Sequence, residues 1–149
     1  MILVALDPSS TACGFAVFDG LRLVDHGTVT RGKRMLTDYA TTCAKTILSA
    51  VTSHGGWEPE VWYETNDRQT IPRERQRSMR LQAQGAGRIL QALGVEGHEK
   101  QADSRTKERR ARDVALIYGL GNASEHAKDA VALGHSIATD PKRLARLHD

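Results

Sequence analysis

The sequence is short of aromatic residues, of cysteines and of long apolar runs. Phe, Trp and Tyr make up 5% of its 149 residues, so stacking on nucleic-acid bases is not an obvious main binding device. The two cysteines, Cys13 and Cys43, lie in apolar stretches without CxxC spacing, which favours reduced core thiols over a disulfide or a zinc site. No apolar run approaches the roughly 18 residues of a membrane span, and residues 1–7 lack the basic start of a signal peptide. These absences predict a cytoplasmic protein without a membrane partner.

A strong overall charge is also missing, since 21 Lys and Arg stand against 18 Asp and Glu and give a net charge of +3. The charge is unevenly distributed, because residues 65–118 hold 12 basic and 7 acidic side chains and the rest of the chain is slightly acidic. A basic segment combined with acids elsewhere suits a polyanion-binding protein with a carboxylate site. The simpler alternative is one solvated, charged helix face.

Hydrophobic periodicity predicts the order βββαβαβαα in one α/β domain with a mixed sheet. The Asp19-Gly20 dipeptide favours a tight hairpin turn, Gly55-Gly56 ends a helix, and Ser124 suits a helix N-cap. From Asp140 the chain is polar and basic, which predicts a loosely held tail over residues 139–149 after a domain over residues 1–138. The predicted strands cover residues 2–7, 13–18, 21–29, 61–64 and 94–101, and the predicted helices cover residues 35–51, 72–93, 105–118 and a segment from 124.

Two acids, Asp7 and Glu64, each close a strand that is otherwise apolar. The carboxyl ends of strands are where ligands bind in open α/β sheets. Either acid taken alone is also explained as a turn former, above all Asp7 before Pro8-Ser9-Ser10.

A third element adds His126 and Asp129, which share one face of the last predicted helix because they are three residues apart. The small apolar residues on the opposite side of this helix would let it lie close to the sheet; they are Ala127, Ala130, Val131, Gly134 and Ile137. Three carboxylates and an imidazole from two strands and a helix form a hard-ligand site suited to Mg²⁺ or Mn²⁺. Taken singly, His126 is equally an exposed histidine in a first helical turn.

These segments, in this order, resemble the RuvC-type Holliday junction resolvases of the ribonuclease H superfamily. ALDPSSTACGFAVFD is similar to the first strand and hairpin of that family, VWYE to the strand that carries its Glu, and HAKDAVALGHSIA to its last helix. The resemblance covers residues 1–138 and, in its compactness, is closest to the phage-encoded branch. The chain departs from the family pattern at Ser9, where a glycine is usual, and at the polar residues 65–67, where some members carry an aromatic residue.

The resemblance implies a ribonuclease H-like fold, with a five-stranded mixed sheet flanked by helices, and an endonuclease that cuts four-way DNA junctions in a bacterial cell or a phage-infected host. Asp7, Glu64, His126 and Asp129 would hold two Mg²⁺ or Mn²⁺ ions, with Asp7 bridging them. Two such ions activate a water and stabilise the leaving oxygen of a phosphodiester. His126 would serve either as an ion ligand or as the group that orients or deprotonates the water.

The same resemblance implies a homodimer, because a two-fold symmetric junction needs two related sites. Its interface would use the apolar face of the helix over residues 72–93, for which core packing within one chain is the alternative. Lys107 lies where the family places a basic residue beside the scissile phosphate. The candidate DNA-binding residues are Arg68, Arg73, Arg75, Arg77, Arg80, Lys100, Arg105, Lys107, Arg109, Arg110 and Arg112.

Three other functions fit part of these observations. A flap or branched-DNA nuclease, or a ribonuclease H, would use the same acids, because fold does not fix substrate. A junction-binding protein without activity is disfavoured by the presence of all four candidate ligands. The segment DPSSTACGFAVFD also resembles the first phosphate loop of actin-like ATPases, but 149 residues are too few for the two domains which that class needs.

Overall fold

The computed structural model describes residues 1–56, 58–65, 85–101 and 107–147. In this part of the chain, one five-stranded sheet has the order β3-β2-β1-β4-β5. The strands are β1 (Ile2–Pro8), β2 (Ala12–Asp19), β3 (Arg22–Thr30), β4 (Glu60–Thr65) and β5 (Gly97–Gln101). Strand β1 is antiparallel to β2 and parallel to β4, and β5 is parallel to β4. The predicted mixed sheet is confirmed, including its fifth strand.

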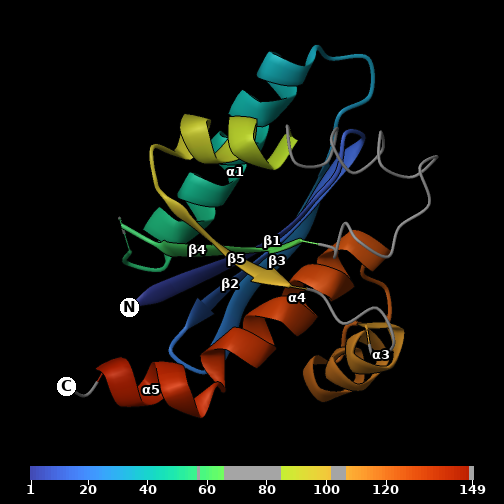
Figure 1. Ribbon diagram of the computed structural model, residues 1–149. Coiled ribbons are helices and arrows are strands. Elements are labelled where there is room, and N and C mark those ends of the chain that lie inside the picture. The colour runs from blue at the N-terminus through green and yellow to red at the C-terminus, as the bar shows by residue number, and fades with distance from the viewer. Residues whose placement is uncertain (57, 66–84, 102–106, 148–149) are drawn as a thin grey trace.

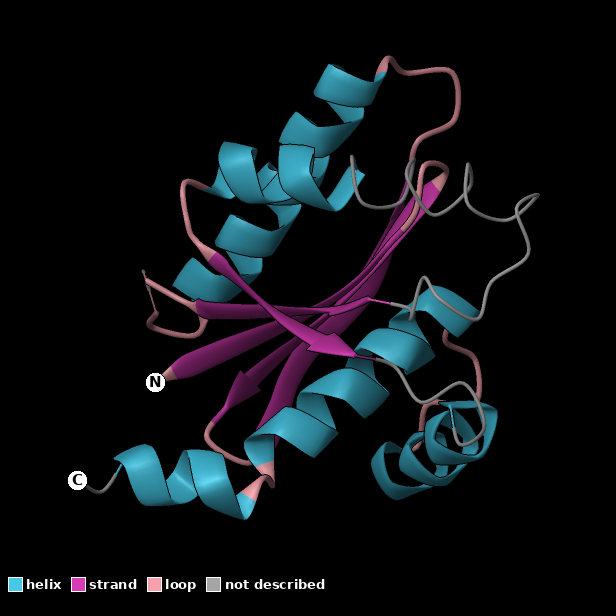
Figure 2. Cartoon of the chain, viewed as in Figure 1, coloured by secondary structure: helices cyan, strands magenta, loops and turns pink. Residues whose placement is uncertain are grey.

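Helices cover both faces of this sheet (Figures 1 and 2). Helix α1 and a helical segment over residues 85–93 lie on one face, and α3 and α4 lie on the other. The labelled helices are α1 (Leu36–Ser53), α3 (Lys107–Tyr118), α4 (Glu125–Ala138) and α5 (Pro141–Leu147). None of the helices in the described ranges has both the length and the apolar character of a bilayer span.

The apolar face predicted for residues 72–93 can be followed over its last part only. Ala86, Ile89 and Leu93 are buried, and Ile89 and Leu93 pack in the core beneath α1, with Leu90 beside them. Core packing within one chain therefore accounts for these residues. Met79 and Ala83, on the same predicted face, lie outside the described residues.

Helix α4 packs very close to the sheet because its inner face is made of small residues. Ser124 caps the helix, since its Oγ accepts a hydrogen bond from the Ala127 amide at 3.1 Å. Near the other end of α4, a Cβ added to Gly134 would lie 2.3 Å from the ring of Phe18. Both the predicted N-cap and the predicted apolar face of this helix are confirmed.

The C-terminal segment is held more firmly than its composition predicts. Helix α5 places Arg143, 8% exposed, against the start of β4, where its guanidinium donates to both carboxylate oxygens of Glu60 at 3.2 and 2.9 Å. The Trp62 indole N–H donates to the same carboxylate at 2.7 Å. The prediction of a loosely held tail is therefore wrong for residues 141–147, whereas the domain boundary at residue 138 stays a prediction.

This contact predicts a pH-dependent loss of stability in Arg143→Ala. Burial would raise the pKa of Glu60, but hydrogen bonds from Arg143 and Trp62 outweigh it and hold that pKa below 4.5. Removing one partner of a buried ion pair costs roughly 3 kcal/mol of unfolding free energy, which urea unfolding at pH 7 measures.

The stabilisation is complete above about pH 4.5, the pKa of an unperturbed glutamate, and is lost as the pH falls through the lowered pKa of Glu60. The difference between wild type and Arg143→Ala should therefore shrink below that pH. A difference that persists unchanged in acid would show that Arg143 stabilises α5 by packing alone. The exposed neighbour Lys142 supplies the matched control, Lys142→Ala.

Candidate active site

Strand β1 turns Asp7 toward the face that α4 covers. Val4 and Leu6 pack in the core beneath α1, whereas Leu3 and Ala5 pack in the core beneath α4. Because successive side chains of a strand point to opposite faces, Asp7 follows Leu3 and Ala5 on the α4 side. The side chain of Asp7 is 20% exposed, at the carboxyl end of the strand.

Strand β4 presents Glu64 on the same face by the same alternation. Val61 and Tyr63 belong to the core beneath α1, and Trp62 packs in the core beneath α4. The parallel register pairs Leu6 with Tyr63, so Asp7 and Glu64 occupy the next position on each strand. Neighbouring strands of a sheet lie about 4.8 Å apart. The expectation that the two acids meet at one edge of the sheet is thus supported by register and alternation.

Gly14 allows the first turn of α4 to touch the sheet beside Asp7. It is the register partner of Asp7, and a Cβ added to it would lie 2.0 Å from the carbonyl oxygen of His126. The next residue across the sheet, Thr28, forms a hydroxyl–hydroxyl hydrogen bond with the capping residue Ser124. The glycine at position 14 of β2 and the hydrogen bond from Thr28 of β3 to Ser124 therefore fix where α4 begins.

This placement brings His126 into contact with Asp7. The imidazole Nδ1 lies 2.8 Å from Asp7 Oδ2, and the side chain of His126 is 39% exposed. The predicted association of the first strand with the last helix is thereby present in the structure. The bond to Asp7 fixes the ring and leaves Nε2 as the nitrogen turned away from the carboxylate.

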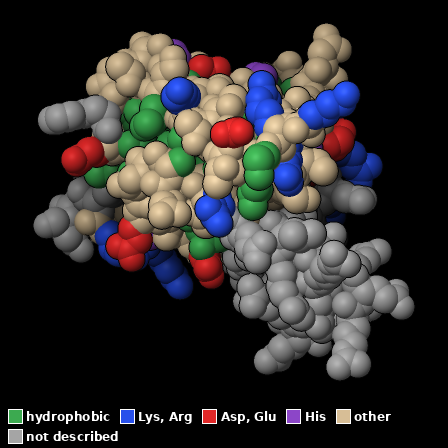
Figure 3. Space-filling view, turned by 90° about the horizontal axis from the view of Figure 1, so that it is seen from above, with side chains coloured by type: hydrophobic (Ala, Val, Ile, Leu, Met, Phe, Trp, Pro, Cys, Tyr) green, Lys and Arg blue, Asp and Glu red, His purple; other side chains and the backbone are tan. Residues whose placement is uncertain are grey.

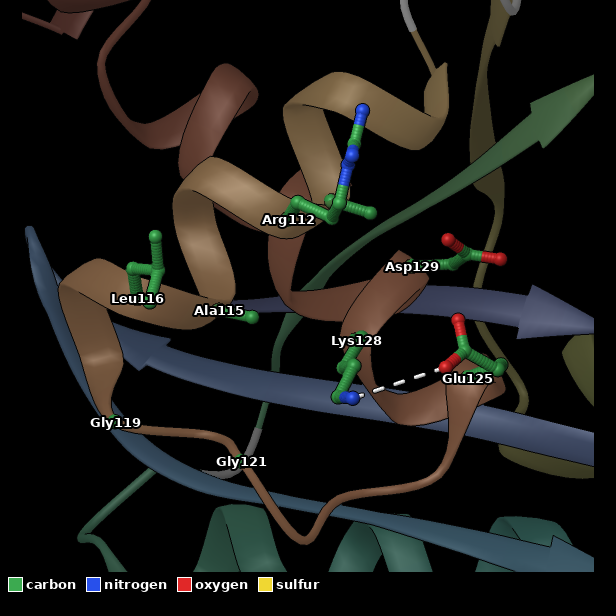
Figure 4. A pocket seen from close by; sticks show the side chains of 9 residues that line it. Arg112, Ala115, Leu116, Gly119, Gly121, Glu125, Lys128 and Asp129 are labelled. Atoms are coloured by element: carbon green, nitrogen blue, oxygen red, sulfur yellow. Dashed lines mark ion pairs between the residues drawn. The ribbon is translucent and has the colours of Figure 1, made fainter.

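Asp129 lies one helical turn further along α4 and lines a pocket of about 990 Å³ between α3 and α4. Figure 4 shows Asp129 and Glu125 extending to the same side of α4, with Arg112 projecting from α3. Lys128 is ion-paired with Glu125 at 3.7 Å. Within the described ranges, no three His, Cys, Asp or Glu side chains are close enough together to hold one metal ion.

Two cations face Glu64 from neighbouring elements. An Arg110 Nη atom of α3 lies 2.5 Å from Glu64 Oε1, and the Glu64 side chain is only 8% exposed, so Arg110 supplies the positive charge that a buried carboxylate needs. Lys100, the register partner of Glu64 on β5, donates from Nζ to Ser136 of α4 at 2.9 Å. Burial and the nearby charge of Arg110 lower the pKa of Lys100.

The other candidate DNA-binding residues divide into three groups. Arg109 and Arg112 are exposed on α3, which is compatible with contact to a large ligand. Nothing is described of the Lys107 side chain, although its backbone begins α3. The remaining candidates lie outside the described residues; they are Arg68, Arg73, Arg75, Arg77, Arg80 and Arg105.

The pairing of Glu64 with Arg110 was not expected from sequence, where Arg110 was one of many candidate phosphate contacts. The two residues are 46 positions apart, so no local pattern indicates that they meet. The Nε of Arg110 is buried and has no hydrogen-bond partner among the described residues. A buried N–H donor without a described partner therefore lies in the side chain that pairs with Glu64.

Comparison with solved structures identifies the architecture. Thermus thermophilus RuvC in complex with a Holliday junction substrate superimposes with a TM-score of 0.70 and 19% identity, over 97% of this chain and 96% of that chain. The chain has the fold of RuvC. A second Thermus thermophilus RuvC structure gives a TM-score of 0.65 and 20% identity over 99% of this chain and 97% of that one. No protein-family model and no curated protein sequence matches the chain.

The RuvC fold confirms the ribonuclease H-like architecture inferred from the sequence. At 19% and 20% identity, the likeness establishes the fold alone. The function of the chain therefore depends on the side chains at the ends of β1 and β4 and at the start of α4.

The close approach at Gly14 predicts that Gly14→Ala displaces α4 from the sheet. Overpacking of this kind costs about 1–3 kcal/mol, and we expect the hydrogen bond between His126 and Asp7 to be lost with it. Urea unfolding measures the destabilisation, and the chemical shifts of the His126 ring report the lost contact.

Gly87→Ala is the matched control. Gly87 is exposed in the helical segment over residues 85–93, and nothing lies within 4 Å of an added Cβ. Alanine is the better helix former there, so the control should be neutral or more stable by up to roughly 1 kcal/mol. Equal stability of Gly14→Ala and wild type would contradict the packing account.

Proposed function

We propose that this chain is a metal-dependent endodeoxyribonuclease that resolves four-way DNA junctions by paired hydrolysis of phosphodiester bonds. The observation that carries the proposal is the placement of Asp7 and Glu64 on neighbouring parallel strands, with His126 at 2.8 Å from Asp7. The fold supports it further, because the superposition on a junction-bound RuvC extends over 97% of the chain.

The donor set fits a divalent ion in the chemistry of its atoms, whereas in this structure no three described His, Cys, Asp or Glu side chains lie close enough together to hold one ion. Carboxylate oxygens with one imidazole suit Mg²⁺ or Mn²⁺, and Asp7 and Glu64 end adjacent strands on one face. Asp7, Glu64, His126 and Asp129 would hold the two ions. When bound, such ions supply activation of a water and stabilisation of the leaving oxygen.

The protein side chains contribute orientation and charge. Asp7 orients the His126 ring through its hydrogen bond to Nδ1. The other ring nitrogen, Nε2, would serve either as an ion ligand or as the group that takes a proton from the attacking water. Arg110 and Lys100 place positive charge beside Glu64.

Substrate selectivity is the finer part of the proposal. A four-way junction is the substrate that Thermus thermophilus RuvC binds in its complex, and it requires two cuts related by two-fold symmetry. A homodimer supplies two such sites. A flap nuclease, or a ribonuclease H with the same acids, is the competing function, because fold does not fix substrate.

Asp7→Asn tests the proposed chemistry most simply. The variant keeps the size of the side chain and removes its charge, so we expect junction binding and folding to be retained and Mg²⁺-dependent cleavage to fall below detection. Asp19→Asn is the control: Asp19 is exposed at the far end of β2, and Asn-Gly favours the same hairpin turn. Cleavage by Asp7→Asn at the rate of the control would refute the assigned site.

A substrate panel tests selectivity with the same wild-type protein. Four-way junction, flap, linear duplex and RNA–DNA hybrid are compared at equal concentration with Mg²⁺. We expect paired nicks in the junction and little cutting of the duplex or the hybrid. Preferential cutting of the hybrid would instead identify a ribonuclease H.

The proposed pairing of two chains predicts a mass in solution near twice 16.4 kDa. Light scattering coupled to size exclusion, over the concentration range of the cleavage assay, measures it. A mass of one chain throughout that range, together with paired cutting, would contradict the proposed homodimer.

A further inference from the structure

A second pocket lies at the end of the sheet where β1 finishes, and its lining residues are not those of the candidate active site. It measures about 500 Å³ and is lined by two adjacent loops, one between β1 and β2 and the other between β3 and α1. Its lining residues are Ser10, Thr11, Arg31, Gly32, Lys33 and Arg34. The residues that line this pocket therefore include three with cationic side chains and two with hydroxyl groups.

Hydrogen bonds hold these two loops in a fixed relation. The Arg31 amide donates to the Thr11 carbonyl at 2.8 Å, and the Arg34 amide closes a tight turn on the Arg31 carbonyl at 3.2 Å. Gly32 has a φ of 58° in that turn, a left-handed conformation that glycine adopts without strain. The backbone of the loop that carries Arg31, Lys33 and Arg34 is thus held in place.

The guanidinium of Arg31 links both sides of the pocket. Its Nε donates to the Arg34 carbonyl at 2.8 Å, and one Nη donates to the Ser10 carbonyl at 3.3 Å. These bonds use two of its five N–H donors. The remaining donors belong to a group that is already oriented, so binding an anion would require little further ordering.

The positive charge of this pocket is not neutralised by an acid of the described chain. No ion pair between described residues engages Arg31, Lys33 or Arg34. Arg110 and Arg143, in contrast, each face a glutamate. Seen from above in Figure 3, Lys and Arg side chains gather toward one side of this end of the molecule, with single acids among them.

The pocket and the candidate active site share one end of the sheet. Thr28 lies across the sheet from Gly14, which lies across from Asp7, and Arg31 follows Thr28 by three residues, roughly 10 Å along the strand. Figure 1 shows the β1–β2 turn and the β3–α1 loop together at the end where β1 finishes. A short stretch of DNA backbone is long enough to reach both places.

We infer that the pocket formed by Ser10, Thr11, Arg31, Lys33 and Arg34 is a binding site for a backbone phosphate of the DNA, away from the bond that is cut. This inference rests on the proposed function. It adds a DNA contact that lies outside the basic segment over residues 65–118. Guanidinium, ammonium and hydroxyl donors are the groups that proteins use on phosphate oxygens. The contact positions the DNA without reading its sequence.

The double variant Lys33→Ala/Arg34→Ala tests this site by affinity. Binding of a fluorescent four-way junction is measured in EDTA at several salt concentrations, so that binding is separated from cleavage. We expect affinity at 100 mM salt to fall about tenfold, and the slope of log K against log salt to decrease by roughly 1–2. Arg22→Ala/Lys45→Ala, which removes two exposed charges elsewhere, should change affinity less than twofold.

Lys33→Glu is a second variant that leaves the loop bonds untouched, because the Lys33 side chain makes no hydrogen bond to the described residues. Reversing its charge should weaken binding more than Lys33→Ala does. Junctions with a single neutral methylphosphonate locate the contact. At one backbone position, the methylphosphonate should lower the affinity of the wild type. The affinity of Lys33→Ala/Arg34→Ala should be the same for that junction as for the unmodified one.

Two outcomes overturn the phosphate site. In the first, Lys33→Ala/Arg34→Ala binds the junction as tightly as the control pair does. In the second, a methylphosphonate at any position lowers the affinity of Lys33→Ala/Arg34→Ala by as much as it lowers that of the wild type. A parallel Mg²⁺ cleavage assay of the wild type separates these from failure of the proposed function. If the wild type binds but does not cut, the proposed function fails and the affinity comparison still decides the phosphate site. If it cuts and the double variant binds normally, only the phosphate site fails.

Discussion

The close contact between α4 and β2 at Gly14 is the constraint on which the site depends. An added Cβ would lie 2.0 Å from the His126 carbonyl oxygen, so the first turn of α4 can lie at this depth only over a residue without a side chain. Gly14 is also the register partner of Asp7. The same contact therefore sets the depth of the helix and the distance of 2.8 Å between His126 and Asp7. The small residues along α4 and the Ser124 cap maintain that depth.

Acidic side chains lie next to this contact, and cations lie around them. The Glu64 carboxylate is almost buried and faces Arg110, whereas Asp7 and His126 are more exposed. A divalent ion at Glu64 would have to share the carboxylate with Arg110 or replace it, because both are cations competing for the same oxygens. Positive charge without an acidic partner in the described chain lies further out, in the pocket of Arg31, Lys33 and Arg34. Acids at the centre with cations around them suit a hydrolytic site for a polyanion.

Much of the arrangement was predictable because it follows from local rules. Apolar runs ending in Asp7 and Glu64 predict strands, and the alternation of side chains places both acids on one face. Contacts between distant residues were not predictable in this way. Arg143 meets Glu60 across 83 positions, and its segment has the composition of a solvated tail. Glu64 meets Arg110 across 46 positions, and nothing distinguishes Arg110 from its basic neighbours in sequence. The cations of residues 31–34 lie outside the basic segment over residues 65–118, and only the folded loops place Ser10 and Thr11 beside them.

The proposed divalent-metal site consists of the carboxylates at the ends of β1 and β4, beneath α4. Its most direct test is a crystal structure of the protein grown with saturating Mn²⁺ and a four-way junction, with data collected for anomalous scattering from manganese. We expect anomalous peaks within bonding distance of Asp7 and Glu64, next to a phosphate of the junction. Absence of manganese at these carboxylates, with Arg110 still bound to Glu64 and the junction seated on the protein, would contradict it.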